Sequence, residues 1–513
     1  MMTSNLRDYL LNGLKNIPGS REFHIHVLLS SPRKYQRLFP YAHPRPRAYL
    51  QDILVLLSEQ TSPDSPRVFT TAIEASVYNV PTTSCAVFYV SKVDSTGQAM
   101  SPSPTATLVR TLLTYYADPA TRPVSADHLW IHLFARAQSQ YLFPNSSEYG
   151  GKRPLSDVKL CAWWKRVLTE AVDDVSARAN AKAVIRLYYT LPGYSQLEAE
   201  QSLRLATVQG PATTTASEPV NAWSYGHPYS QTEIPLPCPP PTADAQRNLG
   251  HIIPSFDDCP KSRFIDEIAC DEEAIRSPPR KRMRTVQHVN GADAPKETGA
   301  AEKEHSGAKE EHVSGELGKV SADEFWERMS FRQECVSGAV TGFFVAGISC
   351  PSLQPAPGMS PLAPSPGQVS SQLNKRVLSS LMTGLEFSTV ERTIKATETL
   401  ESSIKGLCEG ITPIPTPRPV DADRRTPEPE PSHTLLAPPS TPPRRGAAHV
   451  PDVSPNPFPE PITSLETYRS HIYGSICVSN AAPAKTREVT VEAAVGNAAP
   501  HVTVLAVRKK KKA

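Results

Sequence analysis

Alternation of apolar and polar residues predicts a run of β-strands in the first part of the chain. In residues 23–29, Phe23, Ile25, Val27 and Leu29 alternate with polar neighbours, which is the period of a strand with one buried face. Segments rich in β-branched and aromatic residues predict further strands at 49–58, 68–78, 84–92 and 183–190. The strand at 84–92 is followed by the sequence DSTG at 94–97, which is typical of a turn.

Apolar residues spaced by three and four positions predict helices around these strands. The stripes are Leu6/Leu10/Leu14 within 4–15, and Leu108/Leu112/Tyr115 after a start at Ser103 and Pro104. A capping box pairs a Ser with a Glu three residues later, and such pairs open helices at Ser195/Glu198, Ser321/Glu324 and Ser388/Glu391. One more helix is expected to end near Gly384.

The most informative stretch, residues 132–167, joins an aromatic segment to a helix with two adjacent tryptophans. This helix opens near Ser156, and its buried stripe consists of Leu160, Trp164, Val167, Leu168 and Ala171. Trp163 lies about 100° around the helix from Trp164. The apolar face is therefore wide enough to wall a pocket, and the alternative is that both tryptophans simply pack in the core.

Composition divides the chain into a folded body and long irregular segments. The 52 prolines are about twice the ordinary share, and many of them lie between residues 351 and 460. Five segments are expected: a body at 1–272, a disordered insertion at 273–320, helices completing the body at 321–411, a proline-rich linker at 412–460 and a tail at 461–513. The tail is expected to contain a strand at 502–507 and a basic end.

Several classes of protein are disfavoured by what the sequence lacks. No apolar run approaches the roughly 20 residues of a membrane-spanning helix, and the N-terminus does not resemble a secretory signal. Nine cysteines are scattered without a CxxC pair, so neither zinc nor a disulfide framework is expected, and a reducing intracellular compartment is favoured. His24 and His26 could bind a metal, but two exposed histidines on a strand face are the preferred interpretation.

The net charge of +3 hides an asymmetry along the chain. Two clusters, at 280–284 and 508–512, hold nine of the 54 basic residues, and the remaining 45 face 51 acidic residues. A mildly acidic body with basic appendages suits a cationic protein substrate better than nucleic acid. Each basic cluster is interpreted as an import signal or a nucleic-acid contact, or else as a solvated charge run.

Three blocks of sequence resemble one known family. They are FYVSKVDSTG at 88–97, the stretch from Phe134 to Trp164 with SQYLFPNSS, and DDCPKSRF at 257–264 with the helix FWERMSFRQEC at 325–335. WSYGHPYS at 223–230 and the terminal VTVLAVRKKKK fit the same pattern. Together these blocks resemble the fungal histone acetyltransferase family first named as a regulator of transposon mobility, across most of residues 1–411 and the tail.

The resemblance implies an α/β fold with a central mixed sheet wrapped by helices, similar to the CBP-type acetyltransferase core. It implies transfer of acetyl from acetyl-CoA, without a metal, to lysines of newly made histone H3 together with its histone partner. Histone chaperones of the anti-silencing and nucleosome-assembly classes would be partners, in the nucleus, in replication-linked chromatin assembly and DNA-damage tolerance. The alternative from another class is a non-catalytic chromatin scaffold with the same fold.

The resemblance also assigns residues to acetyl-CoA and to the substrate lysine. Aromatic side chains would hold the adenine and the pantetheine arm, while Arg153 and backbone N–H groups would meet phosphates. The cofactor contacts implied are Val93, Met100, Ser101, Pro102, Ser103, Pro104, Phe134, Gln138, Arg153, Pro154, Leu155 and Trp163. Tyr141 and Trp164 would line an apolar channel for the stem of the lysine.

A lysine side chain has a reference pKa near 10.4, so removing its proton at pH 7 costs roughly 4–5 kcal/mol. A carboxylate is therefore needed to accept this proton. The candidates are Asp94, Asp257 and Asp258. The family pattern has two aspartates directly before Pro-Lys, whereas this chain has Cys259 between Asp258 and Pro260. Two alignments with the family pattern therefore stay open. In one, Asp258 takes the first acidic position and Cys259 the second. In the other, a one-residue bulge lets both aspartates keep their roles.

Two further roles are considered for residues of this block. The acids could instead cap a turn and pair with Lys261 or Arg263. Cys259 could carry the acetyl group as a thioester, although direct attack by the lysine is preferred because no histidine lies close in the sequence. Lys261 matches the position that members of the family acetylate on themselves, and this modification would remove a cation from the acidic site.

Overall fold

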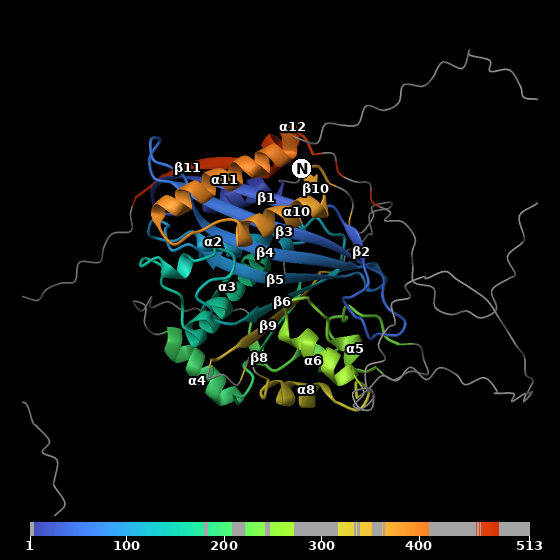
Figure 1. The fold of residues 1–513 in the computed structure, drawn as a ribbon. Helices are drawn as coiled ribbons and strands as arrows, with labels where there is room; N and C mark the ends of the chain where they lie inside the picture. The colour runs from blue at the N-terminus through green and yellow to red at the C-terminus, as the bar shows by residue number, and fades with distance from the viewer. Residues whose placement is uncertain are drawn as a thin grey trace, which may run out of the picture.

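One mixed β-sheet runs through the part of the chain that the structure describes (Figure 1). The structure, a computed structural model, describes residues 5–178, 183–207, 221–241, 247–270, 316–332, 335, 339–350, 362, 365–409, 458, 461 and 463–481. Within these residues the sheet has 11 strands in the order β10-β1-β3-β4-β5-β6-β9-β7-β8, with β11 paired to β1 and β2 to β3. Because β1/β10, β5/β6 and β7/β8 are parallel and the other pairs antiparallel, the predicted mixed sheet is confirmed.

The strands are β1 (Gly19–Ser30), β2 (Arg33–Tyr35), β3 (Ala48–Gln60), β4 (Val68–Val80), β5 (Cys85–Ser95), β6 (His128–Ala135), β7 (Val184–Thr190), β8 (Trp223–Tyr225), β9 (Gly342–Ser349), β10 (Gln368–Val369) and β11 (Tyr473–Asn480). The α-helices are α1 (Leu6–Leu14), α2 (Thr105–Ala117), α3 (Asp157–Arg178), α4 (Gln196–Thr207), α5 (Leu249–Ile252), α6 (Pro260–Ala269), α8 (Ala322–Met329), α10 (Ser371–Thr383), α11 (Val390–Glu409) and α12 (Leu465–Thr467). Short 3₁₀ turns occur at Pro81–Thr83, Ser146–Glu148 and Pro228–Ser230, and a π turn, η4, at Tyr468–Ile472.

Alternation locates β1, and segments rich in β-branched and aromatic residues locate β3, β4, β5 and β7, which confirms these five predicted strands. The short strands β2, β8 and β10 and the longer strands β6, β9 and β11 are missed. Every residue of β9 is buried, and a strand buried on both faces shows no alternation. β11 pairs with β1 and so brings part of the expected tail into the sheet. The strand expected at 502–507, both basic clusters, and nearly all of the expected insertion and linker lie outside the described residues.

Local capping explains most helix starts. Ser195 and Ser321 each cap a helix, α4 and α8, through hydrogen bonds with the glutamate three residues later, as predicted. Two starts differ by one residue: α2 begins at Thr105, and Thr389 rather than Ser388 caps α11. α10 ends at Gly384, as predicted.

Helices cover both faces of the sheet (Figure 1). On one face α1 to α4 pack on alternate residues of the strands, such as Ile53, Val55 and Leu57 in β3. On the other face Leu54 and Leu56 meet α10, α11 and η4, while α5, α6 and α8 cover the part of the sheet near β6 and β9. Within the described residues no helix is both long and apolar enough to cross a bilayer.

The sheet opens at the carboxyl ends of the parallel strands β5 and β6. These strands pair only as far as Val90 and Leu133, although β5 continues along β4 to Ser95. Ser91 has no pairing partner on β4, because the register between β4 and β5 shifts there by a β-bulge. Ligands of α/β proteins bind at the carboxyl ends of parallel strands, and bulges often re-aim side chains beside active sites. The opening is therefore a candidate functional site.

Gly97 brings the loop after β5 against the loop that precedes α3. Its φ of +79° lies in the left-handed region, and a Cβ there would stand 2.5 Å from the Cα of Lys152. Only glycine combines this conformation with so close an approach of two backbones.

Gly97→Ala is therefore expected to lower the free energy of unfolding by about 3 kcal/mol, because strain at positive φ and a backbone overlap add together. The matched control is Gly226→Ala. Gly226 has a φ of +114°, but no atom lies within 4 Å of the position that a Cβ would take, and strain alone costs about 1–2 kcal/mol. Urea unfolding followed by tryptophan fluorescence measures both losses. Equal losses would show that the loops are not in tight contact.

Candidate active site

A cavity of about 190 Å³ lies where β5 and β6 separate. It joins the ends of these strands to α3 and to the start of α6, which are distant in sequence. Six of the residues singled out from the sequence line it: Val93, Phe134, Gln138, Tyr141, Trp164 and Asp258. Its other lining residues, which the sequence does not assign to a cofactor or catalytic role, are Tyr89, Val90, Ser91, Lys92, Leu133, Ala135, Arg136, Leu160 and Arg263.

Trp164 both packs in the core and walls a cavity, as the two interpretations of the tryptophan pair allow. Its indole belongs to the core between α3 and the sheet and also lines the cavity. Trp163 packs edge-on against it, with ring centroids 4.7 Å apart and planes at 76°, but does not line this cavity. Tyr141 closes another side and donates its hydroxyl to the carbonyl of Arg136. Burial raises the pKa of Tyr141 to about 12, so this phenol stays neutral at physiological pH.

Asp258 supplies the carboxylate of the cavity. It lies in the turn before α6 and accepts hydrogen bonds from the Tyr89 hydroxyl at 2.8 Å and the Ser91 hydroxyl at 2.5 Å. The Lys92 ammonium stands 3.5 Å from the same carboxylate. Ser91 and Lys92 are consecutive, and the bulge at Ser91 explains how both reach one acid. The carboxylate is therefore held in a fixed orientation by β5.

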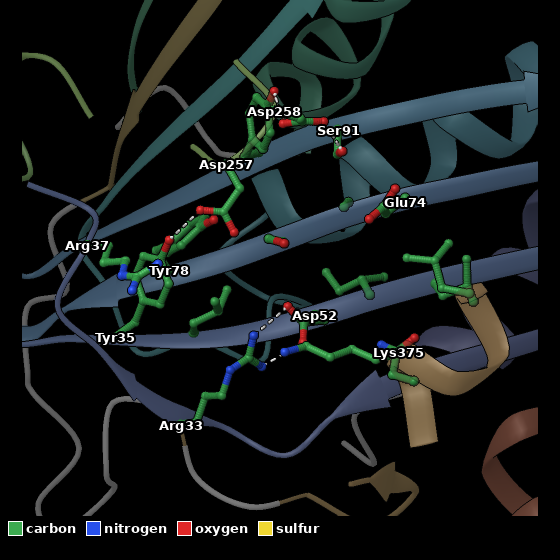
Figure 2. A pocket seen from close by; sticks show the side chains of 18 of the residues that line it. Arg33, Tyr35, Arg37, Asp52, Glu74, Tyr78, Ser91, Asp257, Asp258 and Lys375 are labelled. Atoms are coloured by element: carbon green, nitrogen blue, oxygen red, sulfur yellow. Dashed lines mark hydrogen bonds and ion pairs between the residues drawn. The ribbon is translucent and has the colours of Figure 1, made fainter. Parts of the chain in front are cut away.

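A second and larger cavity, of about 860 Å³, is lined by residues of β2, β3, β4, β5 and α10 and by Asp258 (Figure 2). It shares Tyr89, Ser91, Lys92 and Asp258 with the smaller one, so the two cavities meet at this acid. Asp257 lines only the larger cavity, where it accepts a hydrogen bond from the Tyr35 hydroxyl at 3.3 Å.

Carboxylates and cations both line the larger cavity. Arg33 forms two hydrogen bonds with Asp52, at 2.6 and 3.0 Å (Figure 2). Lys92 binds Glu74 at 2.7 Å. Burial lowers the pKa of Lys92, but its ion pairs with Glu74 and Asp258 outweigh burial and leave the pKa raised. Lys92 is therefore a permanent cation that offsets part of the negative charge beside Asp258.

Cys259 does not reach either cavity. Its side chain is 1% exposed, in the core beneath α6, and burial raises the pKa of its thiol. A buried thiol with a raised pKa is a poor nucleophile. Asp257 and Asp258 thus face the cavities while the cysteine points into the core.

Asp94, also considered from the sequence as a base, lies buried beside the small cavity rather than in its lining. One carboxylate oxygen accepts the N–H groups of Tyr141, Leu142 and Phe143 at 2.7, 2.8 and 3.1 Å. The other accepts the Lys152 ammonium at 2.9 Å and the N–H of Ser95 at 2.8 Å. Both oxygens are occupied, so this acid orients the loop that carries Tyr141.

The other expected cofactor contacts lie on two neighbouring surface loops. Met100 to Pro104 form the loop before α2, in which Ser101, Pro102 and Ser103 are exposed. Arg153, Pro154 and Leu155 are also exposed, in the loop before α3. The contact of Gly97 with Lys152 brings the two loops together. None of these residues lines the small cavity.

Lys261 is 2% exposed, on the first turn of α6. The rings of Phe343, Phe256 and Trp326 surround its ammonium, with centroids at 5.7, 5.8 and 6.0 Å. Within the described residues no carboxylate forms an ion pair with it. Burial lowers the pKa of Lys261, because a charged amine is poorly solvated there.

His24 and His26 are buried, which corrects the expectation that they are exposed. The hydroxyl of Tyr473 binds His24 at 2.9 Å and that of Tyr468 binds His26 at 3.0 Å. Within the described residues no group of three or more His, Cys, Asp or Glu side chains is arranged to hold a metal ion.

Comparison with known proteins agrees with this geometry. The family model for the histone acetyltransferase KAT11-type domain matches residues 120–403, more than half of the chain. The histone acetyltransferase rtt109 of Aspergillus flavus is 29% identical over 315 residues, which are 56% of this chain and 46% of that protein. The histone acetyltransferase rtt109 of Schizosaccharomyces pombe is 24% identical over 339 residues, 64% of this chain and 69% of that protein.

The crystal structure of Rtt109 from Aspergillus fumigatus has the same fold, with a TM-score of 0.57 and 22% identity over 79% of this chain and 96% of that one. The chain spans about half the length of the A. flavus relative. The extent of the domain match shows that the chain belongs to the KAT11-type histone acetyltransferase family. Within it, the named relatives place the chain in the fungal Rtt109-type branch.

Replacing Lys261 with Met is expected to stabilise the protein, most of all at neutral pH and below. Because the folded-state pKa lies below the unfolded value near 10.4, the unfolded chain binds more protons between these two values. The stability of the unmodified protein therefore rises with pH in that window, and the advantage of Lys261→Met shrinks as the pH approaches about 10.4.

Urea unfolding at pH 7 and pH 10 measures this difference. The exposed control Lys395→Met on α11 is expected to show no such dependence on pH. An advantage of Lys261→Met that is the same at both pH values would contradict a cation in an apolar site.

Proposed function

We propose that this protein transfers acetyl from acetyl-CoA to lysine side chains of histones. The observation that carries the proposal is that two cavities meet at one oriented carboxylate, Asp258. A two-substrate transfer needs two approaches to one reaction point and a group there that accepts a proton. Membership of the histone acetyltransferase family supports the donor and the class of acceptor.

The small cavity suits the acetylated end of the cofactor. Trp164, Phe134 and Val93 offer apolar surface to an acetyl group and the adjoining thioester, and 190 Å³ holds only that end of a CoA molecule. The remainder would extend along the loops at 100–104 and 153–155, where Arg153 is exposed and would meet a phosphate. Trp163 packs edge-on against Trp164, outside the small cavity, and would cover the arm between the two regions.

The larger cavity suits the incoming lysine. Asp257 and Asp258 attract the ammonium, since Lys92 already pairs with Glu74, while Tyr35, Tyr78 and Tyr89 line the path of the side-chain stem. Asp258 then removes the proton at the reaction point. The amine nitrogen forms a bond to the acetyl carbon, the carbon–sulfur bond breaks, and CoA leaves as the thiolate, so no enzyme-bound acetyl group is needed.

Tyr89 and Ser91 hold Asp258 in place for this step. Their hydroxyls donate to the carboxylate in the absence of substrate and leave it oriented at the junction of the cavities. Asp258, Glu74 and Asp257 bring several negative charges to this region. The nearby Lys92 ammonium offsets part of that charge. The burial of Cys259 supports direct attack rather than a thioester on the protein.

The finer features of the proposal follow the family resemblance. The acceptor is histone H3 with its histone partner, presented by chaperones of the anti-silencing or nucleosome-assembly class, in the nucleus. The names of the two curated relatives support a histone as the substrate. Lys261 is the proposed self-acetylated residue, because acetylation would replace a buried charge by a neutral amide.

Asp258→Asn is expected to lower kcat by about 10²–10⁴-fold, because the amide cannot accept the lysine proton. The amide oxygen still accepts from Tyr89 or Ser91, so the fold and the affinity for acetyl-CoA are expected to stay near wild type. Acetylation of an H3–H4–chaperone complex, followed by mass spectrometry, gives the rate, and calorimetry gives the affinity for acetyl-CoA.

Two neighbours serve as matched controls. Asp257→Asn is expected to reduce kcat by less than tenfold, since Asp257 lies off the junction, and Cys259→Ala is expected to leave kcat within about threefold. A folded Cys259→Ala protein without activity would favour a thioester mechanism. Wild-type protein that binds acetyl-CoA and histones without transferring acetyl would instead be a scaffold.

A further inference from the structure

Arg21 and Glu59 form a buried ion pair where β1 and β3 end their pairing. Their side chains are 0% and 3% exposed, and one guanidinium nitrogen lies 3.1 and 3.2 Å from the two carboxylate oxygens. The ion pair between Arg33 and Asp52 in the same sheet is about one-quarter exposed on each side. Arg21 and Glu59 are therefore far more enclosed than a surface pair.

The buried pair also holds the main chain of the loop at 100–102. Arg21 donates to the carbonyl of Met100 at 2.7 Å and to the carbonyl of Pro102 at 3.1 Å. Glu59 accepts the N–H of Met100 at 3.1 Å. Both backbone groups of Met100 are thus satisfied by side chains, as a neighbouring strand would satisfy them.

This arrangement couples two buried charges to a surface loop. Burial raises the pKa of Glu59, while Arg21 and the N–H of Met100 act in the opposite direction, so the carboxylate depends on these partners for its charge. Arg21 also donates to the carbonyl of Pro18 at 2.8 Å, which anchors the guanidinium at the start of β1. Displacing the loop would leave buried polar groups without partners, and the loop is therefore held firmly.

Neighbouring bonds fix the two ends of the same loop. The side chain of Gln98 donates to Thr393 of α11 at 2.7 Å, and the Thr105 hydroxyl lies 2.8 Å from that of Thr71. Only Ser101, Pro102 and Ser103 are exposed between these attachments. The loop is a rigid projection whose tip precedes the first N–H groups of α2, a suitable partner for an anionic ligand.

We propose that Arg21, with Glu59, is a positioning residue for acetyl-CoA: it holds the loop at 100–102 in the conformation that receives the cofactor. The inference rests on the proposed function, since the loop matters for binding only if acetyl-CoA is the ligand. Arg21 lies beneath the loop and touches neither cavity, so its effect is on the affinity for the cofactor and not on the chemical step.

Arg21→Lys tests this assignment, because lysine keeps the buried charge beside Glu59 but lacks the planar fork whose two nitrogens reach the carbonyls of Met100 and Pro102. The Kd and the KM for acetyl-CoA are expected to rise about tenfold, with kcat at saturating acetyl-CoA within about threefold and the KM for the histone complex unchanged. Amide hydrogen exchange is expected to be faster in residues 98–104 and unchanged in the strand interiors. Glu59→Gln is expected to act in the same direction through the N–H of Met100.

The matched control is Arg110→Met, which breaks ion pairs of 2.6 and 3.3 Å between α2 and α3 without touching the loop. Its Kd for acetyl-CoA is expected to stay within twofold of wild type. A folded Arg21→Lys protein with unchanged Kd, or with reduced kcat and unchanged Kd, would overturn the inference. Failure of the wild-type protein to bind acetyl-CoA would overturn the proposed function itself, and so the two failures are distinguishable.

Discussion

The buried carboxylate of Asp94 fixes the geometry on which the candidate site depends. It accepts three successive backbone N–H groups, those of Tyr141, Leu142 and Phe143, together with the ammonium of Lys152. Charge-assisted bonds of this kind are about twice as strong as neutral ones, and a buried pair that loses one partner leaves an uncompensated charge. Asp94 follows the opening between β5 and β6, so it ties the loop bearing Tyr141 to the strand that carries Ser91. An acid engaged in this way is a structural anchor, and among the described residues the acid that lines both cavities is Asp258.

The shape of the site follows from a defect in the sheet. The pairing of β5 with β6 stops at Val90 and Leu133, and the bulge at Ser91 turns two consecutive side chains toward Asp258. The small cavity, between α3 and the start of α6, and the larger cavity, along β2, β3, β4 and α10, then share a boundary at this carboxylate. A continuous sheet would have separated them. In the proposed function, this geometry lets donor and acceptor enter different cavities and meet at Asp258.

Local patterns in the sequence predict the strands with a clear alternation or a run of β-branched and aromatic residues. β1 is located by its alternation and β3, β4, β5 and β7 by their composition, whereas β9, which is buried on both faces, is missed. Val93, Phe134, Tyr141, Trp164 and Asp258 are identified through the family resemblance, and all of them line the small cavity. The roles of Tyr89 and Ser91 depend on a bulge and on contacts that join residues 169 and 167 positions apart in the chain. No local pattern encodes such contacts, and for the same reason the sequence alone does not separate Asp94 from Asp258.

The most direct test of the account is a crystal structure of the protein with a conjugate in which a lysine side chain is joined covalently to CoA. The account predicts that the junction lies beside Asp258 and Trp164, that the lysine stem leaves through the cavity lined by Asp257 and Tyr35, and that CoA follows the loops at 100–104 and 153–155. A conjugate bound with its junction away from Asp258, or with CoA in the larger cavity, would contradict it.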